Sequence, residues 1–296
     1  MSDHTPATGG PRKPRIALMG EFSAGKSTLS NLLMGSSPLP EKVTATRLSP
    51  VWMSQGSDTP YRIDVSGATE PIEMARLEEV PVEETFAIRL FLEADILSVC
   101  DLIDFPGISD PNMSSEVWER MLPEVDAVIW CTHATQAWRQ SEAAVWENMP
   151  DAVRKHSILL VTRFDKLTSE RDRTRVIKRV TRETEGQFSG IYPVSLLQAL
   201  AAGEDQDKWD ASGAGPFVHR LIETIETLTK IAECTEAPLY NIPNGEPIPT
   251  RVLRSVAPRR VVRSRDGDAP KRERPPAEPT TETDVPPAGE PIIRSS

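Results

Sequence analysis

The stretch GEFSAGKST, Gly20 to Thr28, places two glycines five residues apart, followed by a lysine and two hydroxyls. It lies between the apolar run RIALM and the leucine-rich run LSNLLM, which is typical of a strand followed by a helix. The spacing fits G-x-x-x-x-G-K-[ST], in which backbone amides and a helix N-terminus surround phosphate oxygens. We expect Lys26 to reach the β and γ phosphates and Ser27 to bind Mg²⁺. The residues predicted to contact the nucleotide here are Glu21, Phe22, Ser23, Ala24, Gly25, Lys26, Ser27 and Thr28.

A second candidate motif ends the apolar stretch LSVCDLIDFPG with D-x-x-G, Asp104 and Gly107. A carboxylate at this place can hold a Mg²⁺-bound water, and a glycine amide can contact a γ-phosphate. The motif is weak alone, because strands often end in Asp and Gly. Its place after the phosphate-binding stretch favours a nucleotide switch.

A third motif, T-R-x-D, ends the apolar run SILLVT with Thr162, Arg163 and Asp165. An Asp carboxylate there can accept hydrogen bonds from guanine N1–H and its exocyclic amine, groups that adenine lacks. Arg163 replaces the usual lysine, and its aliphatic stem can pack on the base or on the phosphate loop. Farther on, YPVSLL places Ser195 and Leu196 where GTPases present backbone amides to guanine O6, a match that rests on order alone.

Strand-like and helix-like stretches alternate between these motifs, which predicts an α/β fold with a largely parallel sheet covered on both faces. Helices are predicted from Lys26 to Met34, with Leu29, Leu32 and Leu33 on one side, and over 115–122, 141–148, 169–185 and 216–234. Strands are predicted at RIALM, VWMS, YRIDV, FAIRLFL, LSVCDLIDF, DAVIWCTH, SILLVT and IYPVS.

The composition divides the chain into three parts. We expect a flexible N-terminus over 1–14, one domain over 15–233, and a proline-rich, partly basic, disordered tail over 234–296, since twelve of the 27 prolines fall between Pro238 and Pro291. The formal charge of −10 argues against non-specific nucleic-acid binding by the body. There is no signal-peptide pattern and no apolar run near the roughly 20 residues that span a bilayer, which favours a cytoplasmic protein.

Several isolated residues allow two interpretations. Trp118, Trp130, Trp138 and Trp146 are more typical of core packing than of a partner surface. Cys100 and Cys131 lie in apolar strands and are expected in the core, and three widely spaced cysteines show neither disulfide nor zinc spacing. His133 is favoured as a polar strand-end residue over a general base.

Taken together, GEFSAGKSTLSNLLMG, the LP-containing loop with Thr46, LIDFPG, VIWCTHATQAWRQSE and TRFD resemble the GTPase domain of the bacterial dynamin-like family, over roughly Arg15 to Glu233. The resemblance implies a Ras-like fold with extra elements. It also implies that a threonine in the loop LPEKVTATRLSP closes on Mg²⁺, with Thr46 the best register and Thr44 the alternative. Ser23 matches a serine that contributes to hydrolysis in that family.

The resemblance further implies pairing of two GTPase domains across their nucleotides, through segments around Thr46 and 108–114. The chain departs from classical dynamins, because no long stalk helices follow Cys234, and Phe22 stands where eukaryotic dynamins carry a catalytic glutamine. We therefore expect slow hydrolysis of Mg²⁺-GTP, with Ser23, Lys26, Thr46 and Gly107 as the catalytic residues and Ser27, Thr46 and Asp104 around the metal.

Two other functions remain open at this point. The protein can be a nucleotide-dependent binding module with negligible turnover, or an assembly component whose helical stalk comes from a separate partner protein. The segment from Arg251 to Arg274 carries nine basic and three acidic residues, so it is a candidate contact with anionic lipid at the inner membrane. A solvated linker is the interpretation we favour for it.

Overall fold

The computed structural model describes residues 12–35, 49–109 and 114–234, and all of them belong to one compact unit. Thr44, Thr46, residues 110–113 and the tail from 235 onward lie outside the described residues. At the N-terminal end, the Arg12 guanidinium donates to both carboxylate oxygens of Asp126, at 2.6 and 2.7 Å. Lys13 donates to the carbonyl of Leu97 at 2.8 Å, so contacts with the body begin at Arg12, inside the segment predicted as flexible.

The described residues form a nine-stranded sheet in the order β4-β3-β5-β2-β6-β1-β7-β8-β9. β1 pairs in parallel with β6 and β7, and β8 pairs in parallel with β7 and β9. β2 runs parallel to β5 but antiparallel to β6, and β3 is antiparallel to both β4 and β5. The largely parallel sheet predicted from the sequence is confirmed. The strands are β1 (Arg15–Gly20), β2 (Val51–Gln55), β3 (Tyr61–Asp64), β4 (Thr69–Pro71), β5 (Thr85–Leu92), β6 (Asp101–Asp104), β7 (Ala127–His133), β8 (Ile158–Thr162) and β9 (Gly190–Pro193).

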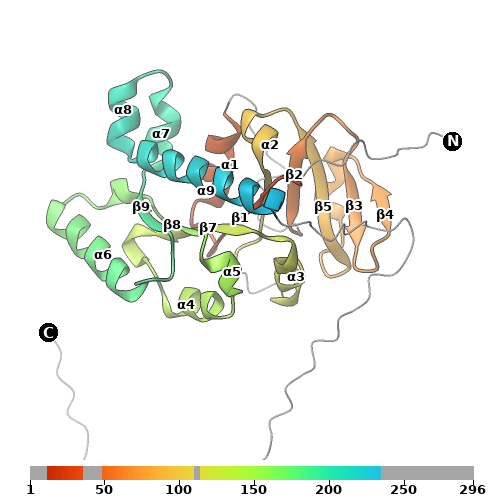
Figure 1. Cartoon of the computed structure of the whole chain (residues 1–296), viewed down its shortest axis with the longest axis horizontal. Helices are drawn as coiled ribbons and strands as arrows, with labels where there is room; N and C mark the ends of the chain where they lie inside the picture. Colours follow the sequence, from red (N-terminus) through yellow and green to blue (C-terminus); the bar gives the residue numbers. More distant parts are fainter. Residues whose placement is uncertain (1–11, 36–48, 110–113, 235–296) are drawn as a thin grey trace, which may run out of the picture. The chain divides into compact units, whose positions relative to one another are not determined.

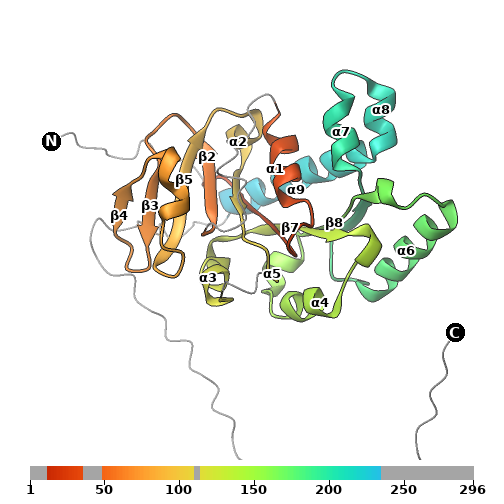
Figure 2. The ribbon, with the colours of Figure 1, turned by 180° about the vertical axis from the view of Figure 1, so that it is seen from behind.

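Helices cover both faces of this sheet (Figure 1), and the view from behind shows the same two layers (Figure 2). The α-helices are α1 (Lys26–Met34), α2 (Asp95–Val99), α3 (Glu116–Glu119), α4 (Gln140–Glu147), α5 (Asp151–Arg154), α6 (Glu170–Glu183), α7 (Leu196–Ala202), α8 (Gln206–Ser212) and α9 (Ala214–Cys234). Short 3-10 helices are η1 (Met74–Glu79), η2 (Leu122–Glu124), η3 (Ala134–Gln136) and η4 (Phe164–Lys166).

Alternation along β1 shows how the sheet separates two cores. Ile16 and Leu18 face a core shared with α1, α2, α7 and α9. Ala17 and Met19 face the other core, which includes residues of α3, α4, α5 and α6. Successive side chains of a strand point to opposite faces, so an uninterrupted apolar run is what a strand between two helical layers requires.

The second core contains the tryptophans singled out in the sequence. Trp130 and Trp146 are fully buried, and their ring centroids lie 5.4 Å apart in an edge-on arrangement. Trp138 packs edge-on against both rings, and Phe188 stacks on Trp146 at 4.1 Å. Trp118 is 6% exposed in the same core, so the core interpretation is confirmed for all four. Cys100 and Cys131 are also fully buried, as predicted.

One predicted strand is wrong in its first half. LSVCDLIDF was expected to be extended throughout, but Asp95–Val99 forms α2 and only Asp101–Asp104 forms β6. In α2, Leu97 alone is buried, while Asp95 lies in the first turn, where an acidic side chain is favourable. An apolar stretch this short does not distinguish one helical turn from a strand.

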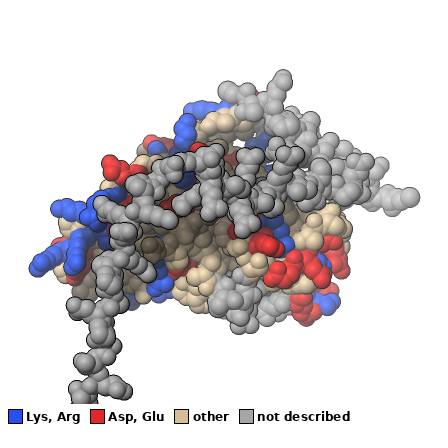
Figure 3. All heavy atoms as spheres, turned by 90° about the horizontal axis from the view of Figure 1, so that it is seen from below, with Lys and Arg blue, Asp and Glu red and all other residues tan. Residues whose placement is uncertain are grey.

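The charged side chains are unevenly distributed. Seen from below, Lys and Arg gather toward the end where α6 lies, and Asp and Glu toward the opposite end, where β3 to β5 lie (Figure 3). The sequence of α6, ERDRTRVIKRVTRE, contributes to the basic end, and only its Val180 is buried. The charged surface helix predicted there is confirmed.

Candidate nucleotide-binding site

The loop between β1 and α1 has a backbone that its glycines make possible. Gly20 has φ 143°, and a Cβ there would lie 2.2 Å from the carbonyl oxygen of Cys131, so no side chain fits. Gly25 has φ 95° and is the N-cap of α1, which begins at Lys26 as predicted. Ser23 has φ 59°, which is uncommon for a residue other than glycine. The loop therefore adopts a tight turn at the carboxyl end of β1, directly before a helix N-terminus.

Lys26 lies under this loop. Its side chain is 9% exposed, and its ammonium donates to the carbonyl oxygens of Gly20 at 3.1 Å and Glu21 at 3.0 Å. Desolvation lowers the pKa of Lys26, and the carboxylate of Asp104 opposes that shift. Lys26 is thus a buried cation held by the first two residues of the loop, close enough to Asp104 for the two charges to interact.

Asp104 and Gly107 follow the strand next to β1. Leu18 of β1 is paired with Asp104 of β6 in parallel register, so both strands end at the same edge of the sheet. Desolvation raises the pKa of Asp104 to about 6, and the Lys26 ammonium opposes the rise. A Cβ on Gly107 would lie 3.0 Å from both N and Cα of Phe22. The Ile108 amide donates to the Gly20 carbonyl at 3.2 Å, so the D-x-x-G segment packs directly on the loop.

The T-R-x-D motif reaches the same loop from the other side. Thr162 ends β8 and is fully buried, and its hydroxyl lies 2.6 Å from the carbonyl oxygen of Ala24 and 3.2 Å from that of Thr132. Arg163 follows with φ 52°, which turns the chain into η4. This turn places Asp165 next to Ser195, two residues after the end of β9.

Asp165 accepts a hydrogen bond from the hydroxyl of Ser195 at 2.8 Å, and its other oxygen lies 3.9 Å from the Lys166 ammonium. The Ser195 amide donates to the carbonyl of Ser212 at 2.9 Å, so Ser195 meets Asp165 through its side chain. A Cβ at Gly25 would lie 3.4 Å from a methyl of Leu196. The two parts of the predicted base-binding site therefore lie together, next to the start of α1.

A divalent cation would find oxygen ligands here. Ser27 and Thr28 lie in the first turn of α1, and Asp104 ends the neighbouring strand. In the described part of the chain there is no group of three or more His, Cys, Asp or Glu side chains that could hold a metal ion. One carboxylate and one hydroxyl fit Mg²⁺, which takes oxygen ligands and fills its other positions with phosphate oxygens and water. Thr46, the third predicted ligand, lies outside the described residues.

Sequence reasoning gave no role to the start of α4, and the structure brings it to the loop. Arg139 donates to one carboxylate oxygen of Glu21 at 2.9 Å, and the Ser141 hydroxyl donates to the other. The stretch containing both residues was noticed only as part of the family resemblance. His133, at the end of β7, accepts a hydrogen bond from the Thr135 amide at 3.2 Å, as a polar strand-end residue does.

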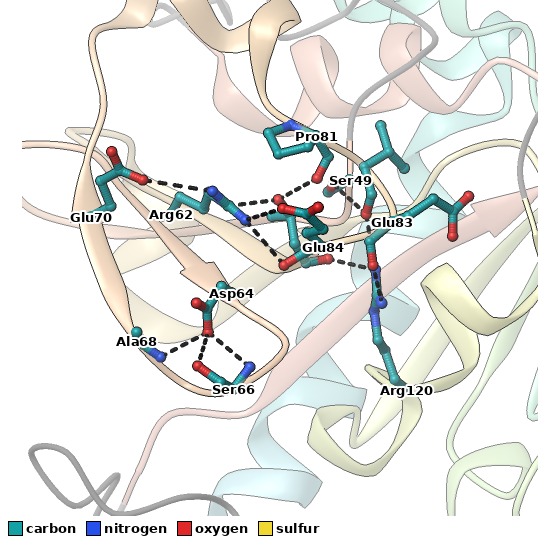
Figure 4. A network of polar contacts seen from close by, with 12 residues as sticks. Ser49, Arg62, Asp64, Ser66, Ala68, Glu70, Pro81, Glu83, Glu84 and Arg120 are labelled. Atoms are coloured by element: carbon teal, nitrogen blue, oxygen red, sulfur yellow. Dashed lines mark hydrogen bonds and ion pairs between the residues drawn. The ribbon is translucent and has the colours of Figure 1, made fainter.

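A further loop, Pro81 to Thr85, connects the regions that flank the two predicted switch segments (Figure 4). Arg120, just after α3, donates to the carbonyls of Val82 at 3.0 Å, Glu83 at 2.9 Å and Thr85 at 2.6 Å. The Ser49 hydroxyl, which follows the segment containing Thr46, donates to the same Val82 carbonyl at 3.4 Å. Arg62 of β3 donates to the Thr85 hydroxyl at 2.8 Å. These bonds fix the loop from three separate parts of the chain.

With this geometry described, comparison with known proteins assigns the family. A profile of the Dynamin family matches residues 16–164, which is half of the chain. The chain belongs to the dynamin family. Its described part is a P-loop GTPase domain, and the predicted α/β GTPase fold is confirmed. No helix among the described residues is long and apolar enough to cross a membrane.

Among relatives of this dynamin-family chain, Dynamin-like protein 2 of Campylobacter jejuni is 24% identical over 223 residues, covering 73% of this chain and 36% of that protein. GTPase Era of Aquifex aeolicus is 23% identical over 196 residues, covering 64% of this chain and 53% of Era. Two solved chains of an oligomerised bacterial dynamin pair align with TM-scores of 0.51 and 0.56 at 19% and 17% identity. They share its fold over 75% of this chain, which spans only 35% and 39% of theirs.

Proposed function

We propose that this protein binds Mg²⁺-GTP and hydrolyses it slowly to GDP and phosphate. The observation that carries the proposal is the meeting of three motifs at one edge of the sheet. Lys26, Asp104 and Thr162 come from segments far apart in the sequence, and each contacts or electrostatically influences the same loop or its lysine. Triphosphate binding needs a cation and backbone amides, and base selection needs an acceptor placed beyond them.

Base choice is assigned to Asp165. Its carboxylate can accept from guanine N1–H and N2–H, which adenine does not offer. Replacing Asp165 with Asn supplies an amide donor where xanthine carries a carbonyl, so Asp165→Asn should exchange guanine preference for xanthine preference. Competition among GTP, XTP and ATP for a fluorescent GDP analogue measures this, with the exposed Asp207→Asn as the matched control. Wild-type protein that binds ATP as tightly as GTP would contradict the proposal.

Catalysis in this proposal depends on positioning. Lys26 and the loop amides offset phosphate charge, Ser23 lies in the same loop, and Thr46 and the Gly107 amide position the γ-phosphate and the attacking water. Mg²⁺, held by Ser27, Thr46 and Asp104, would supply additional charge neutralisation when bound. Phe22 and Ile108 stand where a water-orienting side chain would be useful, and neither can donate or accept a hydrogen bond from its side chain. Turnover by a single copy should therefore be slow.

Pairing of two copies across their nucleotides is the proposed route to faster turnover. Phe22 lies on the loop and is 52% exposed, so its ring is accessible to a second copy at the edge of the site. The solved bacterial dynamin pair is described as oligomerised, which supports association in this family. Phosphate release per enzyme should rise with enzyme concentration, followed alongside mass photometry. A fast rate that does not depend on concentration would contradict pairing.

A nucleotide-dependent binding module is the second candidate, favoured by the apolar Phe22 and Ile108 positions. Tight GTP binding with no measurable phosphate release at any concentration would support it. The bacterial dynamin pair is described as sensing and tethering membranes, so we also propose peripheral membrane association, from the cytoplasm, for this chain. Arg251 to Arg274 is the candidate contact, and the alternative is a solvated linker in a chain that reaches the membrane through a separate helical partner. Flotation with anionic vesicles at low salt, with and without residues 238–296, separates the two.

A further inference from the structure

The phosphate-binding loop contains an acidic side chain, Glu21, next to the backbone that holds Lys26. The Lys26 ammonium lies 3.0 Å from the Glu21 carbonyl oxygen, so Glu21 belongs to the part of the loop nearest the group that serves the β and γ phosphates. A carboxylate there repels a triphosphate unless its charge is offset. The G-x-x-x-x-G-K-[ST] pattern does not require an acid at this position.

The start of α4 offsets that charge. The Arg139 guanidinium lies 2.9 Å from one Glu21 carboxylate oxygen, and the Ser141 hydroxyl donates to the other. The Glu21 side chain is 14% exposed and that of Arg139 is 45% exposed, so the pair lies at the rim of the site, with the carboxylate on the inner side. Both oxygens of Glu21 are therefore directed toward α4.

A buried carboxylate fixes the start of α4. Glu142 is 2% exposed and accepts hydrogen bonds from the Trp130 indole, the Thr132 hydroxyl and the Arg139 amide, each at 2.9 Å. The Trp138 amide donates to the same Thr132 hydroxyl at 2.9 Å. The backbone that carries Arg139 is thus bonded to the strand β7, which pairs with β1 beneath the phosphate loop.

We propose that Arg139 is a positioning residue for triphosphate binding. With Ser141, it turns the Glu21 carboxylate toward α4 and neutralises it, so that the loop accepts the γ-phosphate. This inference rests on the proposed GTP binding and deepens it. It assigns to Arg139 a selective role, because an unpaired Glu21 would repel GTP, with its extra charge, more than GDP.

The test is a double-mutant cycle at Glu21 and Arg139. Arg139→Gln should weaken GTP binding by about tenfold and GDP binding by less. The Glu21 carboxylate would then have no cation to neutralise it, and it would repel the phosphates across a site that is partly exposed to water. Arg139→Lys, which keeps the charge, should retain most of the affinity. Glu21→Gln combined with Arg139→Gln should restore GTP binding to near the wild-type value, since no charge then needs neutralising. Arg154→Gln, which breaks an arginine–carboxylate pair with the exposed Asp151 on α5, is the control.

Each outcome decides the proposal. Unchanged GTP affinity in Arg139→Gln overturns it, and so does a loss that the second substitution does not relieve, or one that is equal for GTP and GDP. Should Arg139→Gln fail to fold, Ser141→Ala serves, because it removes the other donor to the Glu21 carboxylate and should weaken GTP binding more than GDP binding. Unchanged GTP affinity in that variant overturns the proposal. Wild-type protein that binds no GTP refutes the proposed function instead, so the two failures are distinguishable.

Discussion

The hydroxyl of Thr162 provides a sharp test of how the phosphate loop is held. Thr162→Val keeps the β-branched shape in β8 and removes only the O–H group. That hydroxyl has one proton, and the Ala24 carbonyl at 2.6 Å is its nearer acceptor. Ala24 is 2% exposed and Thr162 is fully buried, so water does not readily replace the lost donor. Leaving a buried carbonyl unsatisfied costs about 1–3 kcal/mol, and this degree of burial favours the upper half of that range.

Urea denaturation followed by fluorescence measures the loss. With a slope of roughly 2 kcal/mol per molar for a domain of moderate size, the midpoint should fall by about 1 M. Thr227→Val is the matched control, because its hydroxyl donates to the Glu223 carbonyl at 2.8 Å on the exposed face of α9. That change should stay within about 0.5 kcal/mol. Equal effects of the two substitutions would refute the reasoning, since burial of the Ala24 carbonyl would then not matter.

Three further outcomes are expected. Arg120→Ala should lower the free energy of unfolding by about 1–3 kcal/mol, because three carbonyls each lose one charged donor. Arg76→Ala, which breaks an exposed pair with Glu79, should change it little, and denaturation curves compare the two. Replacing Cys234 with Ser leaves Cys100 and Cys131 as the two thiols of the chain. Burial raises the pKa of both to about 12, so Ellman's reagent at pH ~8 should detect no reactive thiol in the Cys234→Ser variant until it is unfolded. Burial also raises the pKa of Glu142 above its ordinary value of 4.5, so its contribution to stability is complete below that pH and is lost as pH rises through the folded-state pKa. The urea midpoint of the wild-type protein should therefore fall relative to that of Glu142→Gln as pH increases. A wild-type midpoint that rises relative to the variant's midpoint would contradict this.

The core strands were predictable from the sequence because they are buried on both faces. RIALM, DAVIWCTH and SILLVT are continuous apolar runs, and they form β1, β7 and β8 at nearly the expected bounds. The phosphate loop directly follows β1 and the T-R-x-D motif directly follows β8, so a parallel arrangement places both at one edge of the sheet. Helix α1 begins and ends as predicted, with Leu32 and Leu33 packed against the core that buries Leu29. The roles of the individual site residues remain predictions.

Short helices were not predictable in the same way. Leu196–Ala202 and Gln206–Ser212 form α7 and α8, where the sequence predicted no helix. Each is seven residues long, which is too short for a periodic pattern to show, and isolated helices of this length are marginal in water. Packing against neighbours supplies what their sequences do not, as Ala199 of α7 lies in the core with α1 and α9.

The contact of Glu21 with α4 was beyond sequence reasoning for a different reason. Glu21 and Arg139 are 118 positions apart, and opposite charges at such a distance in the sequence carry no register information. A signal did exist locally, because Glu142 three residues after Arg139 is the spacing at which a side chain bonds back to the N-cap amide. It predicts where a helix begins, but not which residue the first turn contacts.

The hydrogen bonds of the loop carbonyls indicate what nucleotide binding would leave in place. The Gly20 carbonyl accepts from the Lys26 ammonium at 3.1 Å and from the Ile108 amide at 3.2 Å. The Glu21 carbonyl accepts from the Lys26 ammonium at 3.0 Å and from the Ala24 amide at 3.2 Å. A triphosphate that draws Lys26 toward itself would therefore leave each carbonyl with a backbone amide donor, and the Glu21 side chain would keep its contacts with Arg139 and Ser141. The loop backbone is thus held independently of Lys26, so the ammonium can move to a phosphate without leaving either carbonyl unsatisfied.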